Sequence, residues 1–135
     1  MIIKKIKIGI MSFQDFQKYT INIAKGKHKR KPDEPKIWFN SIKSLANVLS
    51  EENQKLLSLI VTQKPLSISE LVPLTGRKAN NILRTLRTME NYGLVELIES
   101  KVKTSGRAPI IPKVLYNIAN IELYFGATNP VLPHN

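Results

Sequence analysis

The stretch from Arg77 to Gly93 constrains the fold more than any other part of the chain. Apolar residues recur there at helical spacing and define one helix face: Ala79, Ile82, Leu83, Leu86 and Met89. The other face is polar or basic: Arg77, Lys78, Asn80, Asn81, Arg84, Thr85 and Thr88. No Asp or Glu occurs between Arg77 and Met89, whereas a merely hydrated helix usually mixes charges of both signs. The pattern predicts a helix anchored on one side and basic on the other.

Capping and turn signals place this helix in a longer order of elements. Ser67 and Glu70 have the spacing of a capping box, in which each side chain accepts from the other's backbone N–H, so they predict a short helix. Gly76 predicts the tight turn after it, and Gly93 predicts a left-handed cap after the long helix. Upstream, serines before apolar runs predict three more helix starts: Ser12, Ser41 and Ser50. Downstream, we expect strands over residues 94–99 and 113–123, joined by a basic, turn-rich segment.

The N-terminal part has a different character. Ile and Lys alternate over residues 2–8, which predicts a half-exposed strand, and residues 13–24 carry an aromatic stripe at helical spacing. Residues 26–35 follow, with two prolines and a basic cluster: Lys27, Lys29, Arg30 and Lys31. Such a cluster is either solvated surface or an arm that contacts phosphates.

Composition narrows the classes of function. Twenty-one Lys and Arg against ten Asp and Glu give a net charge of +11, which favours polyanionic partners. No apolar run approaches the ~20 residues of a membrane span, so no membrane association is expected. The chain has no cysteine, which fits a cytoplasmic location. Neither His28 nor His134 has metal-like spacing or an evident carboxylate partner, so we expect no metal, no cofactor and no enzyme.

The element order is typical of a winged helix-turn-helix with an N-terminal strand-helix extension, an α+β fold that is mainly α. The major groove of DNA admits one α-helix, and Arg and Asn can each bond two atoms of a base edge. We therefore expect a sequence-specific regulator, acting as an autorepressor, that inserts the helix 77–92 into the groove. The predicted DNA-binding residues are Arg77, Lys78, Asn80, Asn81, Arg84, Thr85, Thr88, Lys101, Lys103 and Arg107. One alternative is that this is an ordinary amphipathic helix in a helical bundle. Another is RNA binding, which would need exposed aromatic residues for base stacking, and the exposed face of this helix has none.

The expected organisation has three parts. Residues 1–35 would form the N-terminal strand, helix and basic arm, used for dimerisation or partner binding. Residues 36–125 would form the DNA-binding domain, and residues 126–135 a flexible tail. One recognition helix covers only a few base pairs, so a homodimer on two half-sites is expected. The N-terminal strand and helix are the first candidates for its interface, and the last strand and tail are the second.

Residues 65–97, PLSISELVPLTGRKANNILRTLRTMENYGLVEL, resemble the MarR/ArsR-like winged-helix superfamily, in particular its small archaeal and bacterial regulators. The resemblance extends over residues 36–123 and implies a DNA-binding regulator. Some bacterial members of that group resemble antitoxins. The resemblance therefore also implies an alternative, in which a protein-binding module neutralises a small toxin encoded nearby and DNA binding is secondary. Pro73 departs from the usual pattern of the short helix and is expected to shorten it.

Overall fold

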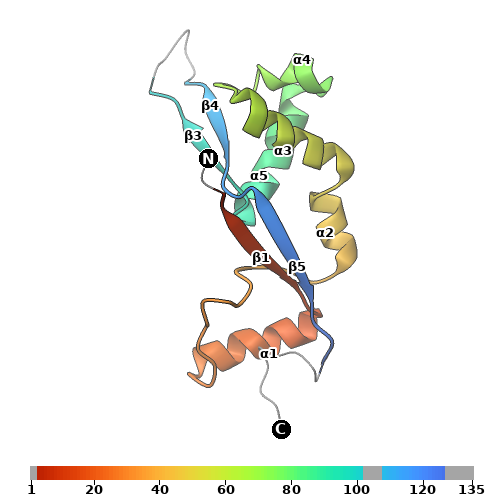
Figure 1. Ribbon diagram of the computed structural model, residues 1–135, viewed down its shortest axis with the longest axis vertical. Helices are drawn as coiled ribbons and strands as arrows, with labels where there is room; N and C mark the ends of the chain where they lie inside the picture. Colours follow the sequence, from red (N-terminus) through yellow and green to blue (C-terminus); the bar gives the residue numbers. More distant parts are fainter. Residues whose placement is uncertain (1–2, 102–107, 127–135) are drawn as a thin grey trace. The chain divides into compact units, whose positions relative to one another are not determined.

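The structure, a computed structural model, describes residues 3–101 and 108–126 (Figure 1). Within these residues it is a mixed α+β fold, as predicted. Its contacts divide the chain into two compact units. The first unit takes residues up to Leu45 together with those from Ile118 onward, and the second takes Ala46–Asn117. The boundary falls within helix α2, Ile42–Val48. This grouping differs from the expected division at residues 35 and 125.

The first unit is built on a parallel sheet of three strands in the order β2-β1-β5. The strands are β1 (Lys5–Ile10), β2 (Ile37–Phe39) and β5 (Ile118–Leu123). Strand β1 lies in the middle, where Ile8 pairs with Ile37 on one side and Ile121 on the other. The alternation of Ile and Lys thus predicted a strand correctly, and its three isoleucines within β1 are buried.

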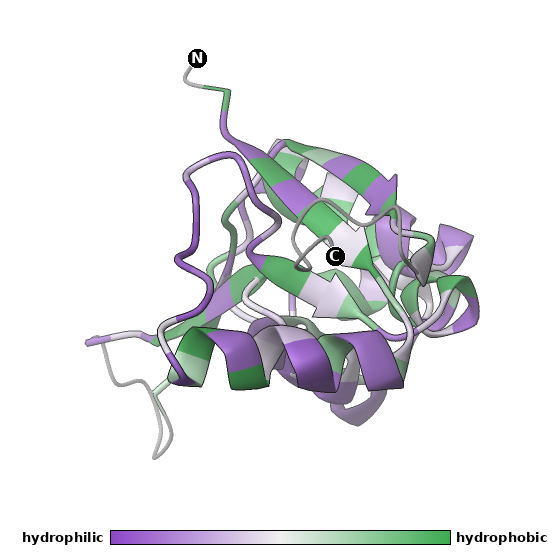
Figure 2. Cartoon of the chain, turned by 90° about the horizontal axis from the view of Figure 1, so that it is seen from below, coloured by the Kyte–Doolittle hydropathy of each residue, from purple (hydrophilic) through white to green (hydrophobic). Residues whose placement is uncertain are grey.

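Helix α1 (Phe13–Ala24) packs on one face of this sheet. It begins where predicted, because the Oγ of Ser12 accepts from the backbone N–H of Asp15 at 3.1 Å. Met11 and Tyr19 form a buried cluster with partly buried neighbours: Phe16, Ile23, Trp38 and Tyr124. A Cβ on Gly9 would lie 2.2 Å from Cζ3 of Trp38, so the indole needs a glycine on β1. Figure 2 shows hydrophobic and hydrophilic residues alternating along this helix.

The second unit contains helices α3 (Glu51–Gln63), α4 (Leu71–Thr75) and α5 (Ala79–Asn91), followed by β3 (Val95–Glu99) and β4 (Ile110–Val114). The two strands form an antiparallel pair. The buried apolar residues come from all three helices, from β3 and from the segments just before α4 and β3: Leu56, Ile60, Ile68, Leu71, Ile82, Leu86, Met89, Leu94 and Val95.

The helix starts follow the predicted caps with one shift. The Oγ atoms of Ser41 and Ser50 accept from backbone N–H groups three residues on, at 3.0 and 3.2 Å. Ser67 likewise accepts from the N–H of Glu70 at 3.3 Å, but the carboxylate of Glu70 accepts from the N–H of Leu66 at 2.7 Å. These contacts stabilise a turn, and α4 begins only at Leu71. Gly76 and Gly93 both have positive φ, as their turn and cap require.

The prediction of a single strand over residues 113–123 was wrong. The chain there changes partner: Leu115 N–H donates to Leu94 at the end of the hairpin, and Ile118 N–H donates to Lys4 at the start of the next ladder. Strand β4 therefore pairs with β3, whereas β5 pairs with β1. Among the helices that the structure describes, none is long and apolar enough to cross a bilayer.

Candidate nucleic-acid interface

Helix α5 is fixed to the second unit by one apolar face. Ile82, Leu86 and Met89 have no exposed surface. These three residues repeat at intervals of four and three, so they form a single row along the helix. The prediction that Ala79 anchors the same face was wrong, because Ala79 is exposed, and Leu83 is half-buried. The row determines which side chains of α5 point away from the core.

The outward face of α5 is the first part of the candidate site. Its exposed polar residues are Asn80, Asn81, Arg84, Arg87, Thr88 and Asn91, and Lys78 is exposed just before the helix. The side chains of Lys78, Asn80 and Arg84 make no hydrogen bond or ion pair with any other residue that the structure describes. Two cations and one amide therefore remain available at the start and on the exposed side of the helix.

The single carboxylate of α5, that of Glu90, contacts both β3 and Arg87. Glu90 is half-buried, and its Oε2 accepts from the backbone N–H of Leu97 on β3 at 3.0 Å. Its Oε1 lies 3.5 Å from Nη1 of Arg87. The acidic group therefore serves the packing of α5 on β3, and its pairing with Arg87 is a partly exposed contact worth little energy.

Arg77, just before α5, makes a second kind of arrangement. Its guanidinium donates from Nε to Oδ1 of Asn81 at 2.6 Å and from Nη2 to Oγ1 of Thr85 at 2.6 Å. It also donates from Nη1 to Oδ1 of Asn53 on α3 at 3.1 Å. We call these four residues the Arg77 network. Arg77 is half-buried here, and its donors hold the beginning of α5 against α3.

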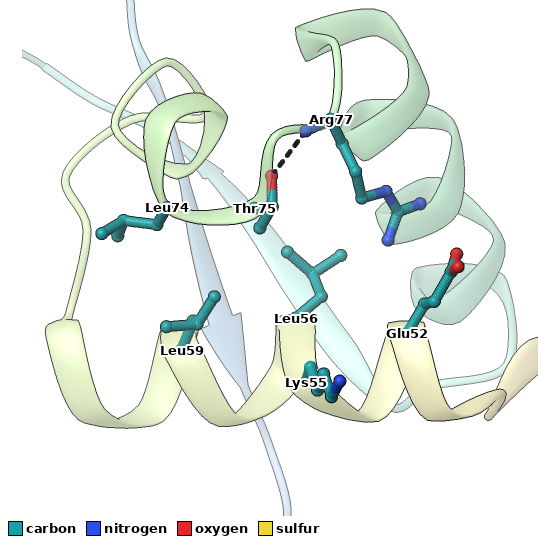
Figure 3. A pocket seen from close by; sticks show the side chains of 7 residues that line it. All are labelled: Glu52, Lys55, Leu56, Leu59, Leu74, Thr75 and Arg77. Carbon is teal, nitrogen blue, oxygen red and sulfur yellow. Dashed lines mark hydrogen bonds between the residues drawn. The ribbon is translucent and has the colours of Figure 1, made fainter.

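Asn53 and the turn before Arg77 secure the network at both ends. The Nδ2 of Asn53 donates to the carbonyl of Val48 at 3.0 Å, which fixes the amide with Oδ1 toward Arg77. The backbone N–H of Arg77 donates to Oγ1 of Thr75 at 3.1 Å (Figure 3). The arginine is thus oriented through both its backbone and its side chain.

A pocket of about 300 Å³ opens beside this network, between α3, α4 and Arg77. Leu59 and Leu74 lie at one end of it, while Glu52 and Arg77 lie at the other (Figure 3). Leu56, Lys55 and Thr75 complete the lining. The size is at the lower limit of ordinary small-molecule sites.

The predicted DNA-binding residues fall into three groups. Lys78, Asn80, Arg84 and Thr88 lie together on the outward face. Arg77, Asn81 and Thr85 are joined in the Arg77 network. Lys101 is exposed beyond the end of β3, whereas Lys103 and Arg107 lie outside the described residues.

Three residues of this region were missed by the sequence reasoning. Arg87 and Asn91 continue the spacing from Asn80 and Arg84 along the outward face, so the helical period alone could have found them. Asn53 carried no such signal, because its role depends on how α3 packs against α5.

The basic arm belongs to the first unit, and all four of its predicted residues are exposed: Lys27, Lys29, Arg30 and Lys31. The expectation that His28 lacks a carboxylate partner was wrong, since its Nε2 lies 2.7 Å from Oε1 of the buried Glu34. This contact is an ion pair when the imidazole is protonated. Tyr19 donates to the other oxygen of Glu34 at 3.0 Å. Glu34 therefore joins the basic arm to α1 through Tyr19 and holds the arm together through His28. His134 lies outside the described residues.

Burial and the neighbouring carboxylate both affect Tyr19. Desolvation, followed by the hydrogen bond to Glu34 and its charge, raises the pKa of the Tyr19 phenol above its usual value of 10.0. Desolvation and the nearby Glu122 also raise the pKa of Tyr124. Both phenols therefore favour the neutral form in the folded first unit.

Neither the curated proteins nor the solved structures yield a match to this chain. Residues 48–114, just under half of the chain and nearly all of the second unit, are similar to the HVO_A0114 family.

Proposed function

We propose that this chain is a sequence-specific duplex-DNA-binding protein that inserts α5 into the major groove and acts as an autorepressor. In this proposal, the segment from α3 to β4 is a winged helix-turn-helix of the MarR/ArsR-like kind, with α4 and α5 as its two central helices. The hairpin of β3 and β4 is the wing, and Lys101 just beyond β3 is exposed beside it.

The outward face of α5 is the observation that carries the proposal. A groove-reading helix needs one face held by packing and another free to reach base edges. Ile82, Leu86 and Met89 on the packed face of α5 are completely buried, whereas Lys78, Asn80 and Arg84 are exposed and have no internal partners among the described residues. Its only carboxylate is directed toward β3. An ordinary solvent-exposed helix of a bundle usually mixes acidic and basic residues on its exposed face, so it does not explain why the basic residues here are separated from the carboxylate.

The side-chain environments suggest different roles for the predicted residues. Arg84 and Asn80 have the donors and acceptors that read guanine and adenine, and both are free to move into a groove. Lys78 and Thr88 suit phosphate contacts. Arg77 already binds three internal acceptors, so we assign it the positioning of α5 rather than a base contact.

The test is fluorescence anisotropy of the purified protein on a duplex from its own upstream region and on a scrambled duplex, over a salt titration. We expect tight binding to the upstream duplex that persists at physiological salt. Arg84→Ala should weaken this specific binding by about 1–3 kcal/mol. Lys18→Ala is the matched control, because it removes the same charge from an exposed position of α1.

Equal binding to both duplexes that disappears with salt would overturn sequence-specific recognition, because such binding reflects only the net charge. Equal losses in Arg84→Ala and Lys18→Ala would remove α5 as the reading element. Preference for a single-stranded RNA of the same sequence would place the protein in a different binding class.

A further inference from the structure

Strand β5 forms an edge of the sheet in the first unit. It pairs with β1 on one side, and the described residues contain no strand on its other side. The opposite edge is β2, which has only three residues. An edge strand presents a row of unpaired N–H and C=O groups that can bind another strand.

This edge lacks the features that usually prevent such pairing. Proteins protect edge strands with lysine, proline or inward-pointing charges, and β5 contains neither lysine nor proline in its sequence IANIEL. Its one charged residue is Glu122, whose Oε1 lies 3.4 Å from Nζ of Lys7 on the neighbouring strand. Ile118, Ile121 and Leu123 are 40%, 46% and 42% exposed. The strand is therefore apolar and open.

The hydrogen bonds to β1 determine which backbone groups of β5 point outward. Ile118 N–H donates to Lys4, and Tyr124 N–H donates to Ile10. Since alternate residues of a parallel strand bond to opposite sides, the residues at 118, 120, 122 and 124 face β1. Ala119, Ile121 and Leu123 direct their N–H and C=O groups to the open edge.

We propose that a second copy of this chain binds here, with the two β5 strands antiparallel about a two-fold axis at Ile121. Ile121 then faces its own copy, and Ala119 faces Leu123, so every outward backbone group of these three residues meets a complementary one. The same register pairs Asn120 with Glu122 and Ile118 with Tyr124 on the other face of the sheet. No two like charges face each other, which is the arrangement that stabilises cross-strand pairs.

Charge does not oppose pairing at this edge. Two copies that each carry +11 repel one another, and β5 is a segment that contributes no positive charge. The pairing would join two three-stranded sheets into one continuous sheet, and a two-fold axis makes the contact self-complementary. The dimer carries two α5 helices, although its formation does not depend on DNA binding.

Disulfide trapping tests the register directly, because the chain has no cysteine of its own. Facing residues of a hydrogen-bonded antiparallel pair have Cα atoms about 5.5 Å apart, which suits a disulfide. Ile121→Cys should therefore give a covalent dimer on mild oxidation of the full chain. Asn120→Cys is exposed and only one residue away, but it faces Glu122 of the partner strand and should remain monomeric on a reducing-agent-free gel.

Light scattering after size exclusion gives an independent measure. The unmodified protein should have twice the mass of one chain, and Ile121→Lys should halve that mass by placing two lysines opposite each other. Ile21→Lys is the matched control, since Ile21 is 49% exposed on α1. It should leave the dimer intact, and circular dichroism should show both variants folded.

A single-chain mass for the unmodified protein across a concentration series would overturn the proposal. A dimer that survives Ile121→Lys, or that crosslinks equally through Asn120→Cys and Ile121→Cys, would place the interface elsewhere. None of these results bears on DNA binding by α5, because the anisotropy assay tests that separately.

Discussion

Nη1 of Arg77 donates to Oδ1 of Asn53 at 3.1 Å and so joins the start of α5 to the first turn of α3. The same guanidinium holds Asn81 and Thr85 along α5. A planar fork that binds three acceptors fixes an orientation as well as a distance. The orientation of α5 relative to α3 therefore depends on the half-buried side chain of Arg77.

Replacing Arg77 should affect stability, unlike replacing exposed cations of the outward face. We expect Arg77→Ala to lower the free energy of unfolding by about 1–3 kcal/mol, because hydrogen bonds to a charged donor are lost. Arg77→Lys should not restore it, since an ammonium cannot reproduce the fork. Urea unfolding measures both, with Arg84→Ala as the control that leaves stability unchanged. A double-mutant cycle with Asn53→Ala should show coupling, and additive effects would contradict the role assigned to the Arg77 network.

The basic arm should contribute charge without sequence preference. Substituting Lys29, Arg30 and Lys31 together by alanine should weaken binding to every duplex. Each lost phosphate contact should also reduce the slope of log K against log salt by about 0.9. The ratio of upstream to scrambled affinity should stay the same. The arm is solvated surface only if the triple variant binds DNA unchanged at low salt.

Gly9→Ala should disturb the packing of Trp38. The new Cβ would meet the indole at 2.2 Å, so either the ring or the strand must move, at a cost of roughly 1–3 kcal/mol. The chain has one tryptophan, and its emission therefore reports on this contact alone. A red-shifted spectrum and a lower melting temperature are expected, whereas unchanged values of both would show that the indole adapts. Ala119→Gly, a change of similar size on the open strand, is the comparison.

Alkaline pH should destabilise the first unit through its buried phenols. The pKa of Tyr19 is raised in the folded state, so the unfolded chain loses this proton first as the pH rises. The stability that Tyr19 contributes is complete below its unfolded pKa of about 10 and is lost as the pH rises above it. The melting temperature should fall less steeply above that pH in Tyr19→Phe than in the unmodified protein. Parallel curves would contradict the assignment.

Local chemistry predicted most of the helices, whereas strand partners could not be predicted. The cap at Ser12 and the apolar row of α5 depend on residues within one or two turns, and both were found. The pairing of Ile8 with Ile37 and Ile121 joins segments far apart in the sequence. A period of two indicates a strand and which residues share a face, but it contains no information about the neighbouring strand.

The candidate site divides in the same way. Helical spacing correctly grouped Asn80 and Arg84, because position on a helix fixes the direction of a side chain. It grouped Arg77 with them as well. Arg77 precedes the first turn of α5, where the direction of a long side chain depends on the acceptors within its reach, and Asn53 became such an acceptor only through folding.

The central position of β1 gives the chain a particular order of assembly. Residues 46–117 form a compact unit whose sequence is continuous, so this unit can fold during synthesis as soon as it leaves the ribosome. Strand β1 is made early, yet one of its two neighbours is β5, which is made more than a hundred residues later. The sheet of the first unit therefore cannot be completed until the second unit has been synthesised. One side of β1 stays unpaired until residues 118–123 have been made.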